Sequence, residues 1–482
     1  MRLLTRQTKI VSTVGPASTN RKTIAALIAA GTDVVRLNFS HGTHDDHRRA
    51  ATFVRQEAER QDRQVSLLQD LQGPRIRVGN MANDCVELAV GKQVLLTAET
   101  METCTAERVS VSYDALARDV TPGGRILVDD GLLELKAVET RGADVLAEVI
   151  VGGPLRSRKG VNLPRVRATG PALTGKDLKD LAVGVEIGVD FIALSFVRDE
   201  TDVVHLRRRV AETGHRAHII AKIEKPEAVA CVDAILAVSD GIMVARGDLG
   251  IEMPMADVPG AQKTIIHKCR EAGKPVITAT QMLESMIENI VPTRAEASDV
   301  ANAVLDGTDA VMLSGETAIG KHPAAVVAAM SSIVLSAEEH WETMPPAKRR
   351  LLRRGEDRAE PNHVTEAVSS TACELAEQVG ATAIVCLTNS GTTARMIARH
   401  RPRVPVYAFT DEPRVVGQMG VLWGTTGFSI PFQHDTDAGV RVVHQTLLDH
   451  GLVRPGDTIV VTAGMPISGK GRTNMVHVSC VS

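Results

Sequence analysis

Three residues in the middle of the chain have types and a spacing that suggest chemistry on a charged substrate. Glu224 and Asp248 each follow an apolar run rich in β-branched residues, and Lys222 lies two residues before Glu224. If the two runs are adjacent parallel strands, about 4.8 Å apart, one cation can contact both carboxylates. Oxygen ligands suit Mg²⁺ or Mn²⁺, and an ammonium on the same side of the strand suits a phosphoryl group in transfer. The alternatives are a surface carboxylate pair and a lysine that only neutralises it.

Further polar residues follow other apolar runs and could bind the same substrate. Arg36 and Arg77 offer fixed positive charge for phosphate. Gly247 and Asp248 precede a helical pattern, so their backbone N–H groups could receive a carboxylate or a phosphate. The Thr280 hydroxyl could orient the substrate or pass a proton, although capping of the next helix explains it equally well.

The elements that must position these residues alternate in a way that predicts a parallel sheet. Eight short β-branched runs are each followed by a longer segment of helical composition, and eight is the number of strands in a (β/α)8 TIM barrel. Barrel enzymes collect their chemistry at the carboxyl ends of the strands, and all eight runs end in polar residues. The runs are KIVSTVG from Lys9, DVVRLN from Asp33, VSLLQD from Val65, FIALSF from Phe191, HIIAKIE from His218, GIMVARGD from Gly241, PVITAT from Pro275 and AVMLSGE from Ala310.

A long interval between the third and fourth runs predicts an inserted domain. Residues 79–174 alternate apolar and polar residues with frequent glycine, which is typical of antiparallel strands, and a small β-barrel at this point would cover the catalytic end as a lid. The barrel itself would comprise residues 1–78 and 175–342. Residues 343–362 are rich in charge and proline and read as a linker, and residues 363–482 suit a smaller α/β domain.

Composition narrows the class of protein. The 482 residues are 44% hydrophobic and 2% aromatic, with a formal net charge of -3, so neither nucleic acid nor an anionic membrane is an expected partner. The first ten residues lack the apolar stretch of a signal peptide, which favours a cytoplasmic location. The seven cysteines are scattered with no C-x-x-C pair, as expected for reduced structural thiols.

Two segments imitate binding motifs. HGTHDDH, from His41, looks like a metal cluster, but on a helix its three imidazoles would spread over more than half a turn. We expect it to open a solvated helix with Asp45 and Asp46 in the first turn. GMPISGKGR, from Gly464, is close to the motif of a phosphate-binding loop, but it has Gly471 where that motif requires Ser or Thr.

Taken together, several strings identify a family resemblance over nearly the whole length. The chain resembles the pyruvate kinases, in the inserted domain and the C-terminal domain as well as in the barrel. The strings are RLNFSHG from Arg36, DLQGPRIRVG from Asp70, KGVNLP from Lys159, AKIEKPEAV from Ala221, DGIMVARGDLGIE from Asp240, ATQMLESMI from Ala279, PTRAEASDVANAVLDG from Pro292 and MLSGETA from Met312.

The resemblance implies conversion of phosphoenolpyruvate and ADP to pyruvate and ATP, the last step of glycolysis, usually by a homotetramer. Glu224 and Asp248 would hold the Mg²⁺ or Mn²⁺ that bridges phosphoenolpyruvate, and Lys222 would stabilise the transferring phosphoryl group. The Gly247 and Asp248 amides would receive the carboxylate, and Thr280 would position the enolate and help its protonation. Contacts to phosphates and nucleotide, and support around the site, are implied for Arg36, Arg77, Asn38, His41, Ser314 and Glu316.

The chain departs from the potassium-dependent members of this family. Those members resemble D-T-K-G-P-E-I-R, whereas this chain has Leu71 and Gln72 after Asp70 and has Arg75 in place of the glutamate. Arg75 is a tethered cation where an acid would favour a bound ion, so we expect K⁺ not to be required. The corresponding monovalent-ion ligands would be Asn38, Ser40, Asp70 and Leu71.

Two other features bear on nucleotide choice and regulation. Asp199 stands where many relatives carry a lysine near the nucleotide, which leaves the nucleotide preference open. TNSGTTAR, from Thr388, follows a strand and opens a helix, and it resembles the family's loop for a sugar-phosphate or AMP effector, with 464–473 as a flap. Ordinary helix capping is the alternative. The implied effector residues are Thr388, Ser390, Gly391, Thr392 and Thr393.

Two competing functions remain. A magnesium-dependent carbon–carbon lyase acting on pyruvate or phosphoenolpyruvate would present a similar Glu–Asp pair, although the inserted domain and Lys222 argue against it. A catalytically silent sugar-phosphate sensor would need a damaged site, yet each expected polar strand end is intact.

Overall fold

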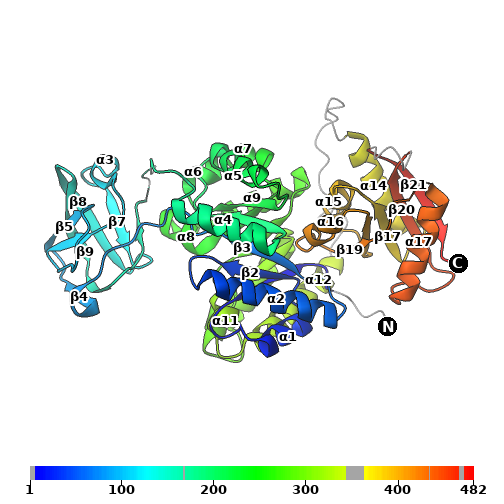
Figure 1. Cartoon of the computed structure of the whole chain (residues 1–482), viewed down its shortest axis with the longest axis horizontal. Helices are drawn as coiled ribbons and strands as arrows, with labels where there is room; N and C mark the ends of the chain where they lie inside the picture. The colour runs from blue at the N-terminus through cyan, green and yellow to red at the C-terminus, as the bar shows by residue number, and fades with distance from the viewer. Residues whose placement is uncertain (1–5, 165, 167–168, 344–362, 434, 466–471) are drawn as a thin grey trace.

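The chain forms three parts arranged in a row (Figure 1). The structure is a computed structural model that describes residues 6–164, 166, 169–343, 363–433, 435–465 and 472–482. A central barrel separates a small β-domain at one end from an α/β domain at the other. The predicted linker 343–362 lies almost wholly outside the described residues, as does the centre of the GMPISGKGR segment.

The central part is a closed parallel barrel, which confirms the predicted TIM-barrel class. All eight predicted runs form its strands, and those that carry Lys222 and Asp248 at their ends are direct neighbours in register. The order around the barrel is β1-β16-β15-β14-β13-β12-β3-β2. The strands are β1 Lys9–Val14, β2 Val34–Asn38, β3 Ser66–Asp70, β12 Phe191–Leu194, β13 His218–Ile223, β14 Gly241–Ala245, β15 Val276–Ala279 and β16 Ala310–Leu313.

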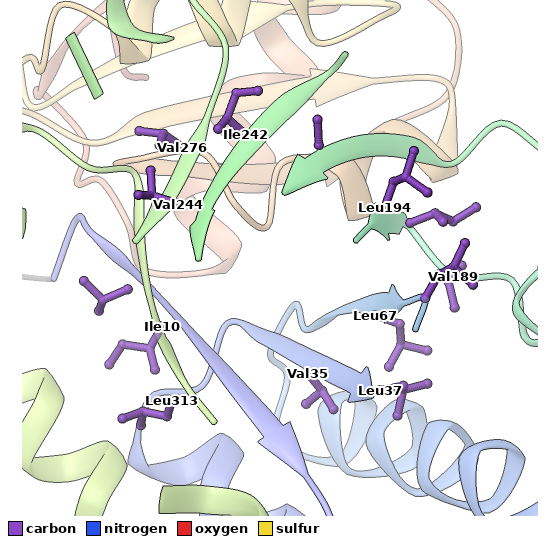
Figure 2. Close-up of a cluster of buried hydrophobic side chains, with 14 of the residues drawn as sticks. Ile10, Val35, Leu37, Leu67, Val189, Leu194, Ile242, Val244, Val276 and Leu313 are labelled. Carbon is purple, nitrogen blue, oxygen red and sulfur yellow. The ribbon is translucent and has the colours of Figure 1, made fainter. Parts of the chain in front are cut away.

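Helices cover the outside of the barrel, and local sequence signals set their ends. Thr43, Thr174 and Thr293 each form a capping box with an acid three residues on, which satisfies otherwise free N–H groups. Figure 2 shows part of the apolar layer to which the strands contribute. The helices are α1 Arg21–Ala30, α2 His44–Arg60, α4 Gly175–Ile187, α5 Glu200–Glu212, α6 Pro226–Ala230, α7 Val232–Val238, α8 Arg246–Glu252, α9 Val258–Ala272, α10 Arg294–Asp306, α11 Gly315–Ala318 and α12 Pro323–Thr343.

The inserted β-domain consists of a six-stranded and a two-stranded sheet around one core of their own. Most pairings are antiparallel, as the alternation predicts, but β5 and β6 pair in parallel. The domain leaves the barrel after β3 and returns before α4. Its elements are β4 Cys85–Leu88, β5 Gln93–Thr97, β6 Arg108–Ser110, α3 Leu116–Asp119, β7 Arg125–Val128, β8 Leu133–Arg141, β9 Asp144–Val151, β10 Gly153–Arg156 and β11 Val161–Asn162.

The C-terminal part is a five-stranded sheet with helices, in the order β19-β18-β17-β20-β21. The sequence predicts β17, β18 and β20 from the apolar runs TAIVCL, VPVYAF and TIVVTAG, but not β19, which is polar with a glycine, nor the antiparallel edge strand β21, which mixes polar and apolar residues. The elements are α14 His363–Gln378, β17 Ala383–Leu387, α15 Thr392–Ala398, β18 Val406–Thr410, α16 Pro413–Gln418, β19 Thr425–Ser429, α17 Thr436–Asp449, β20 Thr458–Gly464 and β21 Thr473–Cys480.

The C-terminal domain closes the amino end of the barrel. Val421, fully buried, belongs to the cluster of side chains that fills the barrel interior. The Lys9 ammonium donates to the Thr425 carbonyl at 2.8 Å. The other end of the barrel is thereby left for the inserted domain and for chemistry. Among the described residues, no helix is both long enough and apolar enough to cross a membrane.

Candidate active site

Lys222 lies at the centre of a buried polar network at the carboxyl end of β13. Its ammonium is 2.9 Å from Glu224 Oε1 and 3.2 Å from Asp70 Oδ1, and it donates to Ser195 Oγ at 2.7 Å. Burial alone would lower the pKa of Lys222, but the charges of Asp70 and Glu224 outweigh burial and raise that pKa above its ordinary value. The ammonium therefore stays charged at neutral pH.

Glu224 lies close enough to Asp248 for the two charges to interact. Glu224 is 1% exposed, and its Oε2 accepts the Phe196 N–H at 2.6 Å. Burial raises the pKa of Glu224, the Lys222 charge opposes this, and the Asp248 charge adds to the rise. A divalent cation beside Glu224 would relieve this repulsion by the Asp248 charge.

Glu224 and Asp248 would supply two protein ligands for such an ion. Within the described ranges, no group of three or more His, Cys, Asp or Glu residues could hold a metal. An ion at Glu224 and Asp248 would take its other ligands from water and substrate, as Mg²⁺ commonly does.

Positive charge surrounds the network. Arg36 Nε is 2.7 Å from Asp70 Oδ2, and its NH1 donates to Thr13 Oγ1 at 3.0 Å. Although burial raises the pKa of Asp70, Lys222 and Arg36 together hold that pKa below its ordinary value. Asp70 therefore stays ionised because of the two cations beside it.

Arg77 and His41 lie on the side of the site toward the inserted domain. Arg77 donates to the Arg158 carbonyl of that domain at 2.9 Å, and Arg75 is 3.5 Å from Asp130 in the same domain. Burial and the nearby charges of Arg77 and Arg75 lower the pKa of His41. At neutral pH a neutral imidazole therefore lies beside arginines that attract phosphate.

Thr280 has an unusual backbone. It follows β15 with φ of +68°, and Gln281 follows with φ of +54°; a β-branched residue rarely adopts such angles. Its hydroxyl accepts the Gly247 N–H at 2.7 Å and donates to the Ala279 carbonyl at 2.6 Å. The Gly247 amide, predicted to receive a carboxylate, is thus covered by the Thr280 hydroxyl.

The residues predicted for a monovalent ion lie at adjacent strand ends. Asn38 pairs in register with Asp70 across β2 and β3. Asn38 Oδ1 accepts the Ser40 N–H at 3.1 Å, and the Leu71 carbonyl accepts the Ser195 hydroxyl at 2.7 Å. Asn38 Oδ1 and the Leu71 carbonyl thus already accept hydrogen bonds within the protein, and Asp70 already has two side-chain cations.

A cavity of about 730 Å³ runs between the barrel and the inserted domain. Asp248, Phe196 and Gly73 line its barrel side, and Tyr113 and Asn162 line its other side. Asn162 Nδ2 also donates to Glu252 Oε1 of α8 at 2.9 Å. The helix that carries Asp248 is therefore bonded directly to the inserted domain.

The HGTHDDH segment forms the start of α2, as predicted, with Asp45 and Asp46 in its first turn. His44 Nε2 is 2.7 Å from Asp180 Oδ1, and the ring of His47 stacks on Phe39. These contacts are structural. Asp199 caps α5 by accepting the Thr201 N–H at 3.1 Å.

The TNSGTTAR loop lines a second cavity, of about 250 Å³, in the C-terminal domain. Gly391 has φ of +75°, and its N–H donates to Thr388 Oγ1 at 3.0 Å. Thr393 Oγ1 and Thr473 Oγ1 are hydrogen-bonded across the cavity wall. Of the predicted effector residues, the cavity is lined by Thr388, Ser390, Thr392 and Thr393.

Sequence reasoning noted Ser195, Thr13 and Arg246 as polar strand ends but assigned them no role. Ser195 and Thr13 hold Lys222 and Arg36 respectively, and Arg246 bonds to the Thr280 loop. Their position at strand ends was the available signal. Their partners lie 23 to 34 residues away, so the bonds themselves could not be read from spacing.

Buried cations beside paired carboxylates, at the open end of a closed barrel and under a covering domain, define a barrel enzyme acting on phosphorylated substrates. A family model described as the pyruvate kinase barrel domain matches residues 5–327, and one described as the pyruvate kinase alpha/beta domain matches residues 366–479. The chain belongs to the pyruvate kinase family. It is a phosphotransferase that converts phosphoenolpyruvate and ADP to pyruvate and ATP.

Individual pyruvate kinases match this chain over nearly its full length, in sequence and in structure. The chain is 45% identical over 475 residues to a pyruvate kinase of Mycobacterium tuberculosis, covering 98% of each chain, and 47% identical over 473 residues to one of Corynebacterium efficiens, covering 98% of this chain and 97% of that one. A crystal structure of a pyruvate kinase from Cryptosporidium parvum matches with a TM-score of 0.90 at 35% identity, covering 99% and 96%.

Proposed function

We propose that phosphoryl transfer takes place beside Lys222, between a divalent ion held by Glu224 and Asp248 and the arginines of the cleft. The observation that carries this proposal is the 2.9 Å contact of the Lys222 ammonium with Glu224, adjacent to the helix that begins at Arg246 and bears Asp248. In the reaction, the bond between phosphorus and the enol oxygen of phosphoenolpyruvate breaks as an ADP β-phosphate oxygen bonds to phosphorus.

The divalent ion is Mg²⁺ or Mn²⁺ in this proposal. When bound, it would neutralise charge on the carboxylate and phosphoryl oxygens of the substrate. Glu224 and Asp248 would be its protein ligands, since both offer hard oxygens and the Asp248 charge contributes to the raised pKa of Glu224. Lys222 contributes a fixed positive charge where the transition state spreads negative charge over oxygens.

The phosphate groups would be held by arginines. Arg36 is fixed by Asp70 and Thr13 and so presents its charge without reorganisation. Arg77 and the neutral His41 suit the nucleotide side, together with Asn38. Because Arg75 and Arg77 also contact the inserted domain, closure of that domain would change the charge that the nucleotide meets.

Thr280 would act on the enolate. A substrate carboxylate that binds the Gly247 amide displaces the Thr280 hydroxyl from it, and the freed hydroxyl then faces the substrate. C3 of the enolate gains a proton to become the methyl group of pyruvate. This step involves no oxidation or reduction. Thr280 positions the enolate for this step and relays the proton from solvent.

We further propose that this chain works without K⁺. Arg36 and Lys222 already neutralise Asp70, the acid of the predicted monovalent-ion group, within the protein. The remaining proposals are that the 250 Å³ cavity binds a sugar phosphate or AMP as an effector and that the enzyme is a cytoplasmic homotetramer.

The decisive test is a steady-state assay of pyruvate formation, coupled to lactate dehydrogenase, with ADP, GDP, Mg²⁺, K⁺ and sugar phosphates varied in turn. We expect pyruvate release to require both a nucleoside diphosphate and a divalent ion. Glu224→Gln should weaken activation by Mg²⁺, whereas Glu227→Gln on the neighbouring α6 should not. Release of pyruvate without nucleotide would instead indicate the lyase.

A further inference from the structure

Arg246 is the first residue of α8, directly before Gly247 and Asp248, and its guanidinium turns away from the cavity into the wall of the barrel. NH1 donates to Asp299 Oδ1 of α10 at 2.7 Å and to Gln262 Oε1 of α9 at 3.3 Å. NH2 donates to the Thr280 carbonyl at 2.8 Å, and Nε donates to the Ala279 carbonyl at 3.3 Å. One side chain thus bonds the Thr280 loop to two outer helices.

The loop needs such support. Left-handed backbone at two successive residues with side chains, Thr280 and Gln281, is strained and persists only when surrounding contacts hold it. Arg246 binds the carbonyls of Ala279 and Thr280, on either side of the first strained residue. On the far side of the loop, Glu316 Oε1 accepts the Leu283 N–H at 3.1 Å.

The contacts also explain why this residue is an arginine. The three nitrogens of the planar Arg246 guanidinium donate at once to two backbone carbonyls, a carboxylate and an amide oxygen. The side chain is only 11% exposed. A lysine offers a single nitrogen at the end of a flexible stem and cannot span these partners.

We propose that Arg246 is a positioning residue that holds the backbone of Thr280 in its left-handed conformation, keeps the Thr280 hydroxyl at the substrate site, and acts on the reaction only through Thr280. This inference rests on the role proposed for Thr280. Releasing the loop lets Thr280 relax toward ordinary backbone angles, which withdraws its hydroxyl from the place where the enolate forms. Substrate binding at the metal pair and Arg36 is unaffected.

The test is a double-mutant cycle of Arg246→Lys and Thr280→Ala in the full-length enzyme. For each variant, kcat and the KM for phosphoenolpyruvate are measured, together with exchange of the pyruvate methyl hydrogens with D₂O in the presence of Mg²⁺ and ATP. We expect Arg246→Lys to lower kcat and methyl exchange roughly tenfold or more, with KM changed less than about threefold. In the Thr280→Ala background the same substitution should cost less than about twofold.

Arg401→Lys is the matched control, because Arg401 is also buried and also binds an aspartate and a backbone carbonyl, but at the amino end of the barrel. It should leave kcat and methyl exchange nearly unchanged. An equal loss of kcat in Arg401→Lys, or losses that multiply in the double mutant, would overturn the role of Arg246. If Thr280→Ala alone has normal kcat and exchange, the role of Thr280 is wrong instead.

A second variant decides the case if Arg246→Lys does not fold. Asp299→Asn keeps both arginine–carbonyl bonds but weakens their anchor on α10. We expect kcat to fall several-fold at unchanged KM, and an unchanged kcat would contradict the proposal.

Discussion

The two ends of the barrel bury charged side chains in opposite ways. At the amino end, Asp309 is surrounded by donors: Arg401 at 2.8 Å, the Val276 N–H at 3.0 Å and the Trp423 N–H at 3.3 Å. At the carboxyl end, burial and Asp248 raise the pKa of Glu224, and Thr280 adopts a strained backbone. The Asp309 charge at the amino end is matched by donors of the protein, while Glu224 at the carboxyl end lies near a second acid, Asp248, whose charge adds to the rise of its pKa.

The difference follows from what covers each end. The C-terminal domain closes the amino end with Val421 in the barrel interior, so partners can be fixed permanently. The carboxyl end opens on a cavity of about 730 Å³ below the inserted domain. Substitutions should therefore separate stability from turnover according to the end that they affect.

The largest expected effect is at the carboxyl end. Lys222→Met should lower kcat by about a thousandfold or more, because the fixed charge next to the transferring group is lost. The KM for phosphoenolpyruvate and the fold should be comparatively little changed, since Arg36 still neutralises Asp70. Steady-state kinetics and thermal unfolding measure both, and near-normal turnover would refute the role of the ammonium.

The opposite result is expected at the amino end. Asp309→Ala should lower the free energy of unfolding by about 3–5 kcal/mol, because it leaves the buried Arg401 without its carboxylate. For the folded fraction, kcat should stay within about twofold. Denaturant unfolding measures the stability, and kcat is measured per folded molecule. A large fall in that kcat would contradict the proposed difference between the two ends.

His218, at the start of β13, should make stability depend on pH. Burial lowers the pKa of His218 to about 4. The charge of Asp240 opposes this fall, and the charges of Arg395 and Arg207 add to it. The unfolded chain binds the proton near pH 6.5, so stability is lost as pH falls from about 6.5 to 4, by up to about 3 kcal/mol. His218→Gln should flatten the unfolding free energy in this window.

The lowered pKa of Asp240 contributes only at more acidic pH, because its stabilisation is lost below the unfolded value of about 3.8. His205→Gln, on the exposed face of α5, is the control and should retain the wild-type slope. A slope unchanged in His218→Gln would show that other groups dominate.

The smallest effect concerns the monovalent ion. Arg75→Glu should lower activity in a large organic cation and restore it several-fold on addition of K⁺, because an acid then replaces the tethered cation. The unmodified chain should respond less than twofold to K⁺. A strong activation of the unmodified chain by K⁺ would contradict potassium independence.

The sequence alone determined the barrel, the number and order of its strands and the residues at their polar ends. These are local patterns. A stretch of a few residues is enough to predict each strand and to place Lys222, Glu224 and Asp248 at its end. It did not reveal β19, which is polar and contains a glycine, or β21, which mixes polar and apolar residues; each of them pairs with a strand that has a clear apolar run.

Only the tertiary structure decided which groups meet. Arg36 bonds to Thr13 and Asp70, Arg246 to the Thr280 loop, and the Thr280 hydroxyl covers the Gly247 amide. Val421, far along the chain, fills the barrel interior. Such contacts depend on the closure of the barrel and the docking of a second domain, because hydrogen bonds and packing act over ångströms in space, whatever the separation along the chain.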